Sequence, residues 1–248
     1  MIGRVEKYLL NRIHQGDAIH LTLIDPEKSP PEAAAETARD AERDETAAVM
    51  VGGSTVTSTR LLEDTVKAIK ATVRIPVILF PNNITGICPN ADAIWFMSLI
   101  NSTDPYFIVG AHVLGAPLVK KLGLEPIPLG YVIVGEGGAA SLIGRAFPIP
   151  FDKPELAVAH ALAAEYLGMR FIYLEGGSGV KKSVPPSMIR MVKKAINIPL
   201  IVGGGIRSGH QAKEIVEAGA DMIVTGNITE ETGTRTKLRD LIGSIRRQ

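Results

Sequence analysis

Two acidic residues stand at the ends of apolar runs, and their carboxylates are candidates for catalysis or metal binding. Asp25 follows the run LTLI, and Glu175 closes the run FIYLE. Partial desolvation of Glu175, between an apolar strand and a glycine-rich loop, would raise its pKa toward the range useful to a general base. Asp25 precedes Pro26 and has a second interpretation as a helix cap. We therefore expect Glu175 to be catalytic and Asp25 to act in a site or as a cap.

A hydroxyl follows the next apolar run, at Ser54 in the motif VGGS. Asp25 and Ser54 together offer hard oxygen ligands, too few to enclose Ca²⁺ but suited to an Mg²⁺ ion shared with substrate phosphates. The sequence therefore predicts Mg²⁺ at Asp25 and Ser54, and with it a second phosphorylated substrate.

Glycine clusters follow further apolar runs, at 176–179, 203–205 and 226. One cluster would suit a tight turn, whereas several supply backbone amides that can converge on an anion. We expect a phosphate site made by Gly204, Gly205, Gly226 and Asn227. The segment GGGIRSG at 203–209 does not fit the Gly-x-Gly-x-x-Gly pattern, which disfavours a dinucleotide site.

Other reactive side chains point to no competing chemistry. No lysine ends an apolar run, so a Schiff-base nucleophile is not evident. The five histidines lack metal-ligand spacing, and we interpret them as structural or solvated. Cys88 is the only cysteine, which excludes an internal disulfide.

Short apolar runs bounded by turn signals predict the elements that must position these residues. Most runs are continuously apolar, as in parallel strands covered on both faces. The predicted strands are Ile19–Ile24, Ala47–Val51, Pro76–Phe80, Ala93–Met97, Leu129–Val134, Phe171–Glu175, Leu200–Gly203 and Asp221–Thr225. The predicted helices are Pro31–Arg43, Ser58–Thr72, Pro105–Leu122, Pro154–Leu167, Pro185–Ala195, Ser208–Ala218 and Thr229–Arg247.

This alternation over 248 residues favours an α/β fold, a TIM-type (β/α)8 barrel forming a single domain over 1–248, rather than a doubly wound sheet. Only PNNITGICPNAD separates Phe80 from Ala93, so we expect the third helix to be missing or replaced. Gly3–Gln15 is expected to form a helix that closes the bottom of the barrel. All the residues above would then meet at the carboxyl ends of the strands, where such barrels place active sites.

Charge and hydropathy exclude several classes of partner. Lysine and arginine number 27 against 26 aspartate and glutamate, and aromatic residues make up 5% of the chain. No electrostatic field or stacking platform would gather nucleic acid. The chain has neither a signal peptide pattern nor 18 consecutive apolar residues, so we expect a cytoplasmic enzyme without an integral membrane segment.

Five motifs in order resemble the geranylgeranylglyceryl phosphate synthase family of archaeal ether lipid biosynthesis, over the whole chain. They are LTLIDPEK at 21–28, VGGS at 51–54, YLEGGSG at 173–179, VGGGIRS at 202–208 and VTGN at 224–227. The first and third are specific, and FMSLINSTDPYFIVGAH at 96–112 looks like the fourth strand and helix of that family.

The resemblance implies transfer of a C20 prenyl group from geranylgeranyl diphosphate to the 3-hydroxyl of sn-glycerol 1-phosphate, with release of diphosphate and a requirement for Mg²⁺. Asp25 and Ser54 would hold Mg²⁺, and Glu175 would accept the hydroxyl proton. Glycerol phosphate would contact Tyr173, Leu174, Glu175, Gly176, Gly177, Ser178 and Gly179. Its phosphate would contact Gly204, Gly205, Gly226 and Asn227.

Alternatives stay open at this point. Bacterial relatives in the family use a longer donor, as heptaprenylglyceryl phosphate synthases, and a phosphate-binding barrel isomerase or a barrel that merely binds a phosphorylated metabolite would share the glycine motifs. The C20 chain would lie in a groove beside Trp95, Phe96, Tyr106 and Phe107, or these aromatics pack the core. The family contains dimers and hexamers, so we expect a homo-oligomer, with only transient membrane contact.

Overall fold

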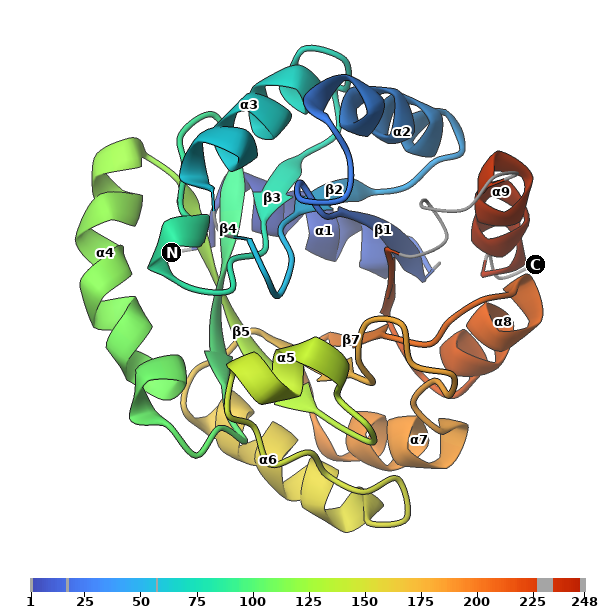
Figure 1. Cartoon of the computed structure of the whole chain (residues 1–248). Coiled ribbons are helices and arrows are strands. Elements are labelled where there is room, and N and C mark those ends of the chain that lie inside the picture. The colour runs from blue at the N-terminus through green and yellow to red at the C-terminus, as the bar shows by residue number, and fades with distance from the viewer. Residues whose placement is uncertain (1, 17, 57, 227–233, 246–248) are drawn as a thin grey trace.

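The computed structural model describes residues 2–16, 18–56, 58–226 and 234–245, and within them eight parallel strands close into one barrel in chain order (Figure 1). The strands are β1 (Ile19–Ile24), β2 (Ala48–Val51), β3 (Val77–Leu79), β4 (Ala93–Leu99), β5 (Glu125–Ile133), β6 (Phe171–Glu175), β7 (Leu200–Gly203) and β8 (Met222–Thr225). The TIM-type barrel is thus confirmed, and each predicted strand is present, although several of the bounds differ.

Helices lie around the barrel, and one, α1 (Arg4–His14), lies across its end (Figure 1). The remaining α-helices of the described residues are α2 (Pro31–Arg43), α3 (Thr59–Lys70), α4 (Ala111–Leu122), α5 (Gly138–Ile143), α6 (Pro154–Tyr166), α7 (Pro186–Ala195), α8 (Gly209–Glu217) and α9 (Thr234–Ser244). None of the helices in the described ranges is both long enough and apolar enough to cross a membrane. The predicted helix Thr229–Arg247 is present as α9. Most of its residues beyond the bounds of α9 lie outside the described residues.

The connection between β3 and β4 contains no α-helix, as the sequence predicts. A three-residue 3₁₀ turn, Ile84–Gly86, stands there, and the side chain of Asn83 accepts from the amide of Thr85 at its start. The next helix begins as a π-helical turn, Tyr106–Gly110, that continues directly into α4. The outer ring is therefore thin beside β3 and β4.

Two features differ from the sequence prediction. Strand β5 begins at Glu125, four residues before the expected Leu129, and pairs with β4 from that residue onward. Pro126 and Pro128 hide this extension in the sequence, because proline is usually a strand breaker. Helix α5 was not expected either, since GAASLI is too short to display a helical period.

The side chains of each strand alternate between two apolar layers. Phe171 and Tyr173 of β6 face the barrel interior, where Trp95 packs edge-on against Phe171 with ring centroids 5.3 Å apart. Ile172 and Leu174 lie in the layer between the strands and the outer helices. This alternation decides which residues of a strand can reach a cavity inside the barrel.

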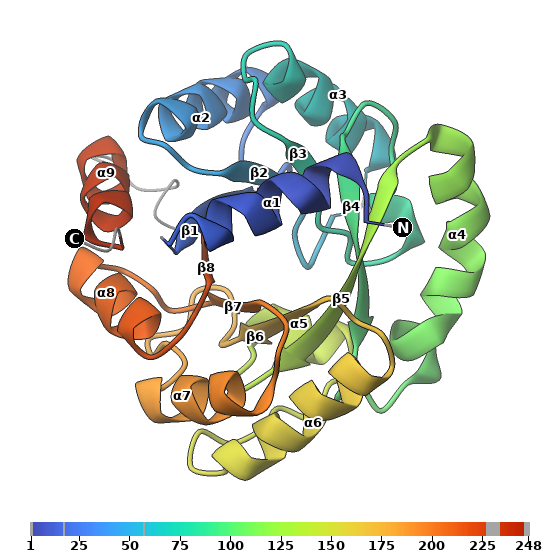
Figure 2. The ribbon, with the colours of Figure 1, turned by 180° about the vertical axis from the view of Figure 1, so that it is seen from behind.

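Helix α1 crosses the amino-terminal end of the barrel, as predicted for the N-terminal segment (Figure 2). Its own N-cap residue, Gly3, supplies no side-chain oxygen, and the carboxylate of Glu125 accepts instead from the amides of Val5 and Glu6, both at 2.8 Å. The fully buried Glu6 in turn accepts two hydrogen bonds from Arg170. These contacts fix α1 across the bottom of the barrel.

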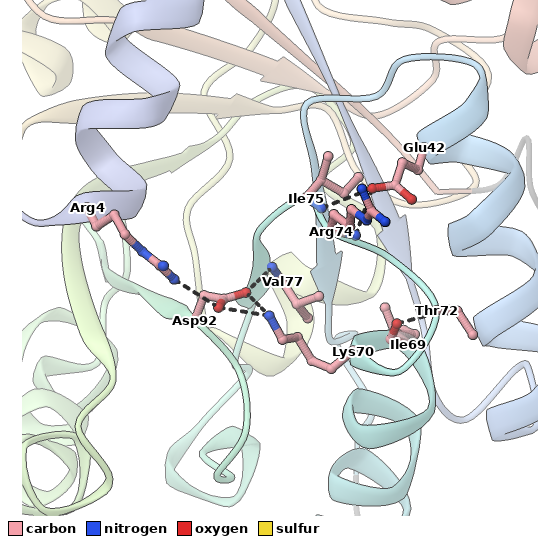
Figure 3. A network of polar contacts seen from close by, with 9 residues as sticks. All are labelled: Arg4, Glu42, Ile69, Lys70, Thr72, Arg74, Ile75, Val77 and Asp92. Carbon is pink, nitrogen blue, oxygen red and sulfur yellow. Dashed lines mark hydrogen bonds and ion pairs between the residues drawn. The ribbon is translucent and has the colours of Figure 1, made fainter.

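The same end carries carboxylates with several donors each. Asp92 accepts from the backbone amide of Val77 at 2.8 Å and from Lys70 Nζ at 2.7 Å, and Arg4 Nη2 lies 3.4 Å away (Figure 3). Glu42 accepts from the amides of the loop that leads into β3, at Arg74 and Ile75 (Figure 3).

This arrangement recurs four strands further along the chain. Asp221 accepts from the amide of Leu200 at 2.7 Å and pairs with Lys193, as Asp92 does with Val77 and Lys70. Glu165 accepts from the amide of Asn197 at 3.0 Å, in the role of Glu42. Both halves of the barrel are therefore tied at this end by the same set of ionic hydrogen bonds.

Candidate active site

A polar cavity opens at the carboxyl ends of the strands, opposite α1, and it gathers most of the predicted site residues. Loops after β1, β2, β6, β7 and β8 contribute to its wall. Among the predicted residues that line it are Asp25, Ser54, Tyr173, Glu175, Gly177, Ser178, Gly204, Gly205 and Gly226. Residues 150 or more positions apart in the chain thus meet in one site.

Glu175 is the buried carboxylate of this cavity. Only 7% of the residue is exposed, and its Oε1 accepts from the amide of Gly177 at 2.6 Å. Burial raises the pKa of Glu175, and hydrogen bonds from Gly177, Tyr173 and Tyr131 partly offset that rise by stabilising the carboxylate. This is the environment expected of a general base, held by neutral donors rather than by a cation.

Glycine is required beside Glu175 for reasons of space as well as conformation. Gly204 has a φ of +83°, and a Cβ at this position would lie 2.5 Å from Glu175 Oε1. A Cβ on the neighbouring Gly203 would collide with the hydroxyl of Tyr173. The backbone of the loop after β7 therefore passes close to the carboxylate of Glu175 and is exposed to the cavity.

Asp25 and Ser54 line the same cavity from adjacent strands. Asp25 Oδ1 accepts from the amide of Glu27 at 3.1 Å within a turn, but Asp25 is not a helix cap, because the next helix, α2, has Pro30 as its N-cap residue. The carboxylate lies against Gly53, where a Cβ would stand 2.6 Å from Oδ2.

The donor set around Asp25 fits Mg²⁺ held jointly with a ligand. Within the described residues no three His, Cys, Asp or Glu side chains gather as a metal cluster. One carboxylate and one hydroxyl leave most positions of an octahedral ion to water and phosphate oxygens, which is the usual way proteins hold Mg²⁺. The lack of a side chain at Gly53 leaves room for the carboxylate of Asp25 at the cavity wall.

Three of the predicted ligands are not part of the cavity lining, and a fourth lies outside the described residues. The side chain of Leu174 packs in the outer layer between strands and helices, since it alternates with Tyr173 and Glu175, so only its backbone can serve the site. Gly176 and Gly179 belong to the same loop but do not line the cavity. Asn227 lies outside the described residues.

A second, apolar groove runs along the thin flank of the barrel, between β4, the 3₁₀ turn and α4. Its wall includes Ile84, Ile87, Phe96, Phe107 and Gly115. The groove meets the polar cavity at five residues lining both, here called the junction: Gly53, Ser54, Phe80, Tyr131 and Ala140. An apolar chain and a phosphate-bearing headgroup could therefore meet at this point.

The four aromatics proposed for the groove divide between two roles. Phe96 and Phe107 line it, and Trp95 reaches it although it is fully buried and packs on Phe171 in the interior. Tyr106 is not part of the lining; it packs edge-on against Phe107 and donates to Asn83. The apolar groove and the barrel core thus share the side chain of Trp95, because β4 lies between them.

Sequence reasoning missed Phe80, Tyr131 and Ala140 at the junction. Phe80 and Tyr131 occur within or beside apolar strand runs, where aromatic residues usually signal only packing. The feature that could have pointed to Tyr131 is its cross-strand pairing with Tyr173. The two residues are opposite each other in the register of β5 and β6, and both hydroxyls interact with Glu175. Ala140 belongs to α5, the helix that the sequence did not indicate.

The histidines follow their expected structural role with one addition. His20 lies between the hydroxyls of Thr46 and Thr225, at 2.9 and 2.8 Å, and burial lowers its pKa to about 3, which keeps it neutral. His112 packs edge-on against Phe96 and lines the apolar groove. None of the described residues that line the polar cavity is a histidine.

Comparisons with known proteins identify the family of this chain. The PcrB family model matches residues 11–244. A geranylgeranylglyceryl phosphate synthase from Thermofilum pendens is 54% identical over 99% of this chain and 94% of its own length, and one from Pyrococcus furiosus is 51% identical over 99% and 98%. The crystal structure of (S)-3-O-geranylgeranylglyceryl phosphate synthase from Thermoplasma acidophilum, in complex with its substrate sn-glycerol-1-phosphate, has a TM-score of 0.94 at 40% identity and covers 99% of both chains. The chain therefore belongs to the PcrB family, together with these synthases.

Proposed function

We propose that this chain is a prenyltransferase that transfers a geranylgeranyl group from geranylgeranyl diphosphate to the 3-hydroxyl of sn-glycerol 1-phosphate, the first ether bond of archaeal membrane lipids. The observation that carries the proposal is the junction, where a polar cavity with a buried carboxylate meets an apolar groove. Full-length similarity to synthases with this substrate in one crystal structure supports the choice of acceptor.

The acceptor occupies the polar cavity. Backbone amides of the loops after β6, β7 and β8 surround its phosphate, with Gly204, Gly205 and Gly226 lining that side. Amides freed by glycine hold an anion without a basic patch, which suits a chain of formal charge +1. The glycerol end then points along β6 toward Glu175.

Asp25 and Ser54, which follow β1 and β2, would hold an Mg²⁺ ion in the same cavity. When bound, that ion supplies positive charge that neutralises the leaving diphosphate. Gly53 gives the carboxylate of Asp25 the room for this contact.

Glu175 accepts the proton of the 3-hydroxyl. The oxygen of that hydroxyl forms the new bond to C1 of the prenyl group, while the bond from C1 to the diphosphate oxygen breaks and diphosphate leaves with the electron pair. General base assistance of this kind contributes about 10²–10⁴-fold. The remaining acceleration comes from holding both substrates at the junction, where Glu175 is shielded from water.

The prenyl chain lies in the apolar groove, beside Phe96 and Phe107. A donor series from C15 to C35 tests the chain length, with the highest turnover expected for C20. Preference for C35 would assign the chain to the heptaprenyl branch of the family instead.

The enzyme works in the cytoplasm as a homo-oligomer and contacts the membrane transiently, because its product carries a C20 chain. Size-exclusion chromatography with light scattering checks the assembly, and vesicle sedimentation with and without product checks the contact.

The decisive experiment uses radiolabelled sn-glycerol 1-phosphate with geranylgeranyl diphosphate and Mg²⁺, and measures label in the organic phase. We expect an organic-soluble product from the sn-1 acceptor and little from its sn-3 enantiomer. Equal use of both enantiomers, or retention of all label in water, would contradict the proposal.

A further inference from the structure

Glu175 has to present a free edge of its carboxylate to the acceptor hydroxyl, so the groups that orient it matter as much as its pKa. Its Oε1 is engaged by the amide of Gly177 at 2.6 Å, and the hydroxyls of Tyr131 and Tyr173 are its other hydrogen-bond donors in the described chain. A carboxylate with several fixed donors has little freedom to rotate. Gly177 and the two tyrosines therefore set together how Glu175 faces the cavity.

Of these donors, Tyr131 is the one at the junction. It lines both the polar cavity and the apolar groove, whereas Tyr173 and Gly177 line the polar cavity alone. Tyr131 reaches this place because β5 sets it directly opposite Tyr173 in the register with β6, with both side chains inside the barrel.

The ring of Tyr131 is held on two sides. It packs edge-on against Phe80 and Tyr173, with centroids 5.7 and 5.2 Å away and interplanar angles of 85° and 82°. Only 6% of Tyr131 is exposed. A ring fixed by two aromatic neighbours delivers its hydroxyl to Glu175 in one orientation.

We propose that Tyr131 is a positioning residue for the transfer reaction: its hydroxyl donates to Glu175 and holds that carboxylate facing the junction, where the prenyl C1 and the acceptor hydroxyl meet. The role in the transfer reaction rests on the proposed function, whereas the contact between Tyr131 and Glu175 does not depend on it. It assigns to β5 a role in catalysis through a residue that touches both substrate compartments.

The test compares Tyr131→Phe with the wild type in kcat, in KM for both substrates and in the pH profile of kcat/KM. We expect kcat to fall about 10- to 100-fold, because a hydrogen bond to a charged group is lost while the ring stays. The KM for sn-glycerol 1-phosphate should change less than about threefold, since the amides around the phosphate are untouched.

The acid limb of the profile distinguishes positioning from mere packing. The hydrogen bond from Tyr131 lowers the pKa of Glu175, so its loss leaves burial less opposed and moves the limb to higher pH. Asp25, Lys28, Arg207 and Tyr173 also line this cavity, and any limb that Glu175→Gln retains is assigned to them. An unshifted limb in Tyr131→Phe would overturn the proposal.

A double-mutant cycle adds a second criterion. If Tyr131 acts through Glu175, Tyr131→Phe on the Glu175→Gln background should cause at most a twofold further loss. A further loss as large as in the wild-type background would assign Tyr131 a separate role and overturn the proposal. Tyr8→Phe is the matched control, because it removes a tyrosine hydroxyl that donates to the carbonyl of Ala47 at the other end of the barrel, and it should leave kcat and the limb unchanged.

A titration without turnover separates this inference from the proposed function. Carbon-13 NMR of side-chain-labelled glutamate, compared between the wild type, Tyr131→Phe and Glu175→Gln, reports the pKa of Glu175 directly. A rise in Tyr131→Phe is expected even if the enzyme were to use other substrates, and an unchanged pKa would overturn the inference. Failure of the proposed function alone would appear as a wild type that forms no prenylated product.

Discussion

The two ends of the barrel treat carboxylates in opposite ways. At the amino-terminal end, Asp92 and Asp221 each pair with a lysine and a backbone amide, and Glu6 pairs with Arg170. At the carboxyl end, Glu175 is buried among tyrosines and a glycine amide. Charge pairing stabilises the fold at one end, whereas at the other end burial raises the pKa of the proposed base.

This difference indicates that substitutions at the two ends of the barrel should affect stability and activity separately. Substitutions at the carboxyl end should change turnover with little loss of stability, and those at the amino-terminal end should do the reverse. Each experiment below would break or sharpen that division.

Metal removal should have the largest effect. EDTA is expected to reduce product formation to background and added Mg²⁺ to restore it, because the diphosphate leaves poorly while its charge is uncovered. The melting temperature should stay the same, since the ionic hydrogen bonds that tie the barrel lie at its amino-terminal end, away from Asp25 and Ser54. Full activity in EDTA would remove Asp25 and Ser54 from a metal role.

Glu175→Gln comes next. Turnover should fall at least about 10²-fold, with little change in sn-glycerol 1-phosphate binding measured by calorimetry. A raised folded-state pKa means that the carboxylate's contribution to stability is present below its unfolded-state pKa and is lost as pH rises through the folded-state pKa, so above that pKa the ionised group is unfavourable to folding. The variant should therefore melt at the same temperature or higher. Unchanged turnover would exclude Glu175 from the mechanism.

Asp92→Ala should show the reverse pattern. It removes the acceptor for Val77 and the partner of Lys70, and we expect a loss of about 3 kcal/mol in unfolding free energy. That corresponds to a melting temperature lower by about 6–12 °C in calorimetry. Asp221→Ala is the matched substitution in the other half and should lose a similar amount. Turnover at 25 °C should stay near wild type for both, and a parallel loss of turnover would break the division between the two ends.

Arg4→Ala should have the smallest effect, although Arg4 contacts the same carboxylate. Its side chain is 87% exposed and lies 3.4 Å from Asp92 Oδ1. Exposed ion pairs contribute little, so we expect less than about 0.5 kcal/mol in urea unfolding and even less in high salt. A loss comparable with that of Asp92→Ala would mean that the charge of Arg4, rather than the buried donors, holds this end.

Much of the fold was predictable because its strands are buried on both faces. Runs such as Leu200–Gly203 are apolar throughout, and they mark β7 without knowledge of its neighbours. The start of β5 was not, because Pro126 and Pro128 conceal strand pairing that the barrel imposes. The short α5 was equally invisible, since it packs its first residues against the loop Gly177–Ser178 rather than displaying a period of its own.

The site was predictable where a residue follows directly on a strand and hidden where it depends on closure of the barrel. Asp25, Ser54 and Glu175 could be placed at one end from the strand boundaries alone, and the structure brings them to one cavity. Phe80 and Tyr131 could not, because their importance comes from the meeting of two cavities. The ionic pairs of Asp92 and Asp221 were hidden for the same reason, since their partners lie in other segments.

The 3₁₀ turn that replaces a helix has a consequence for motion. Within the described strands, β3 and β4 share two register pairs, Ile78 with Ala93 and Leu79 with Ile94, fewer than any other neighbours in the ring. The wall should therefore open first along this seam, and the amides of β3 should exchange with deuterium earlier than those of β6. The seam adjoins the apolar groove, so local opening between β3 and β4 would let a long product leave sideways from the groove.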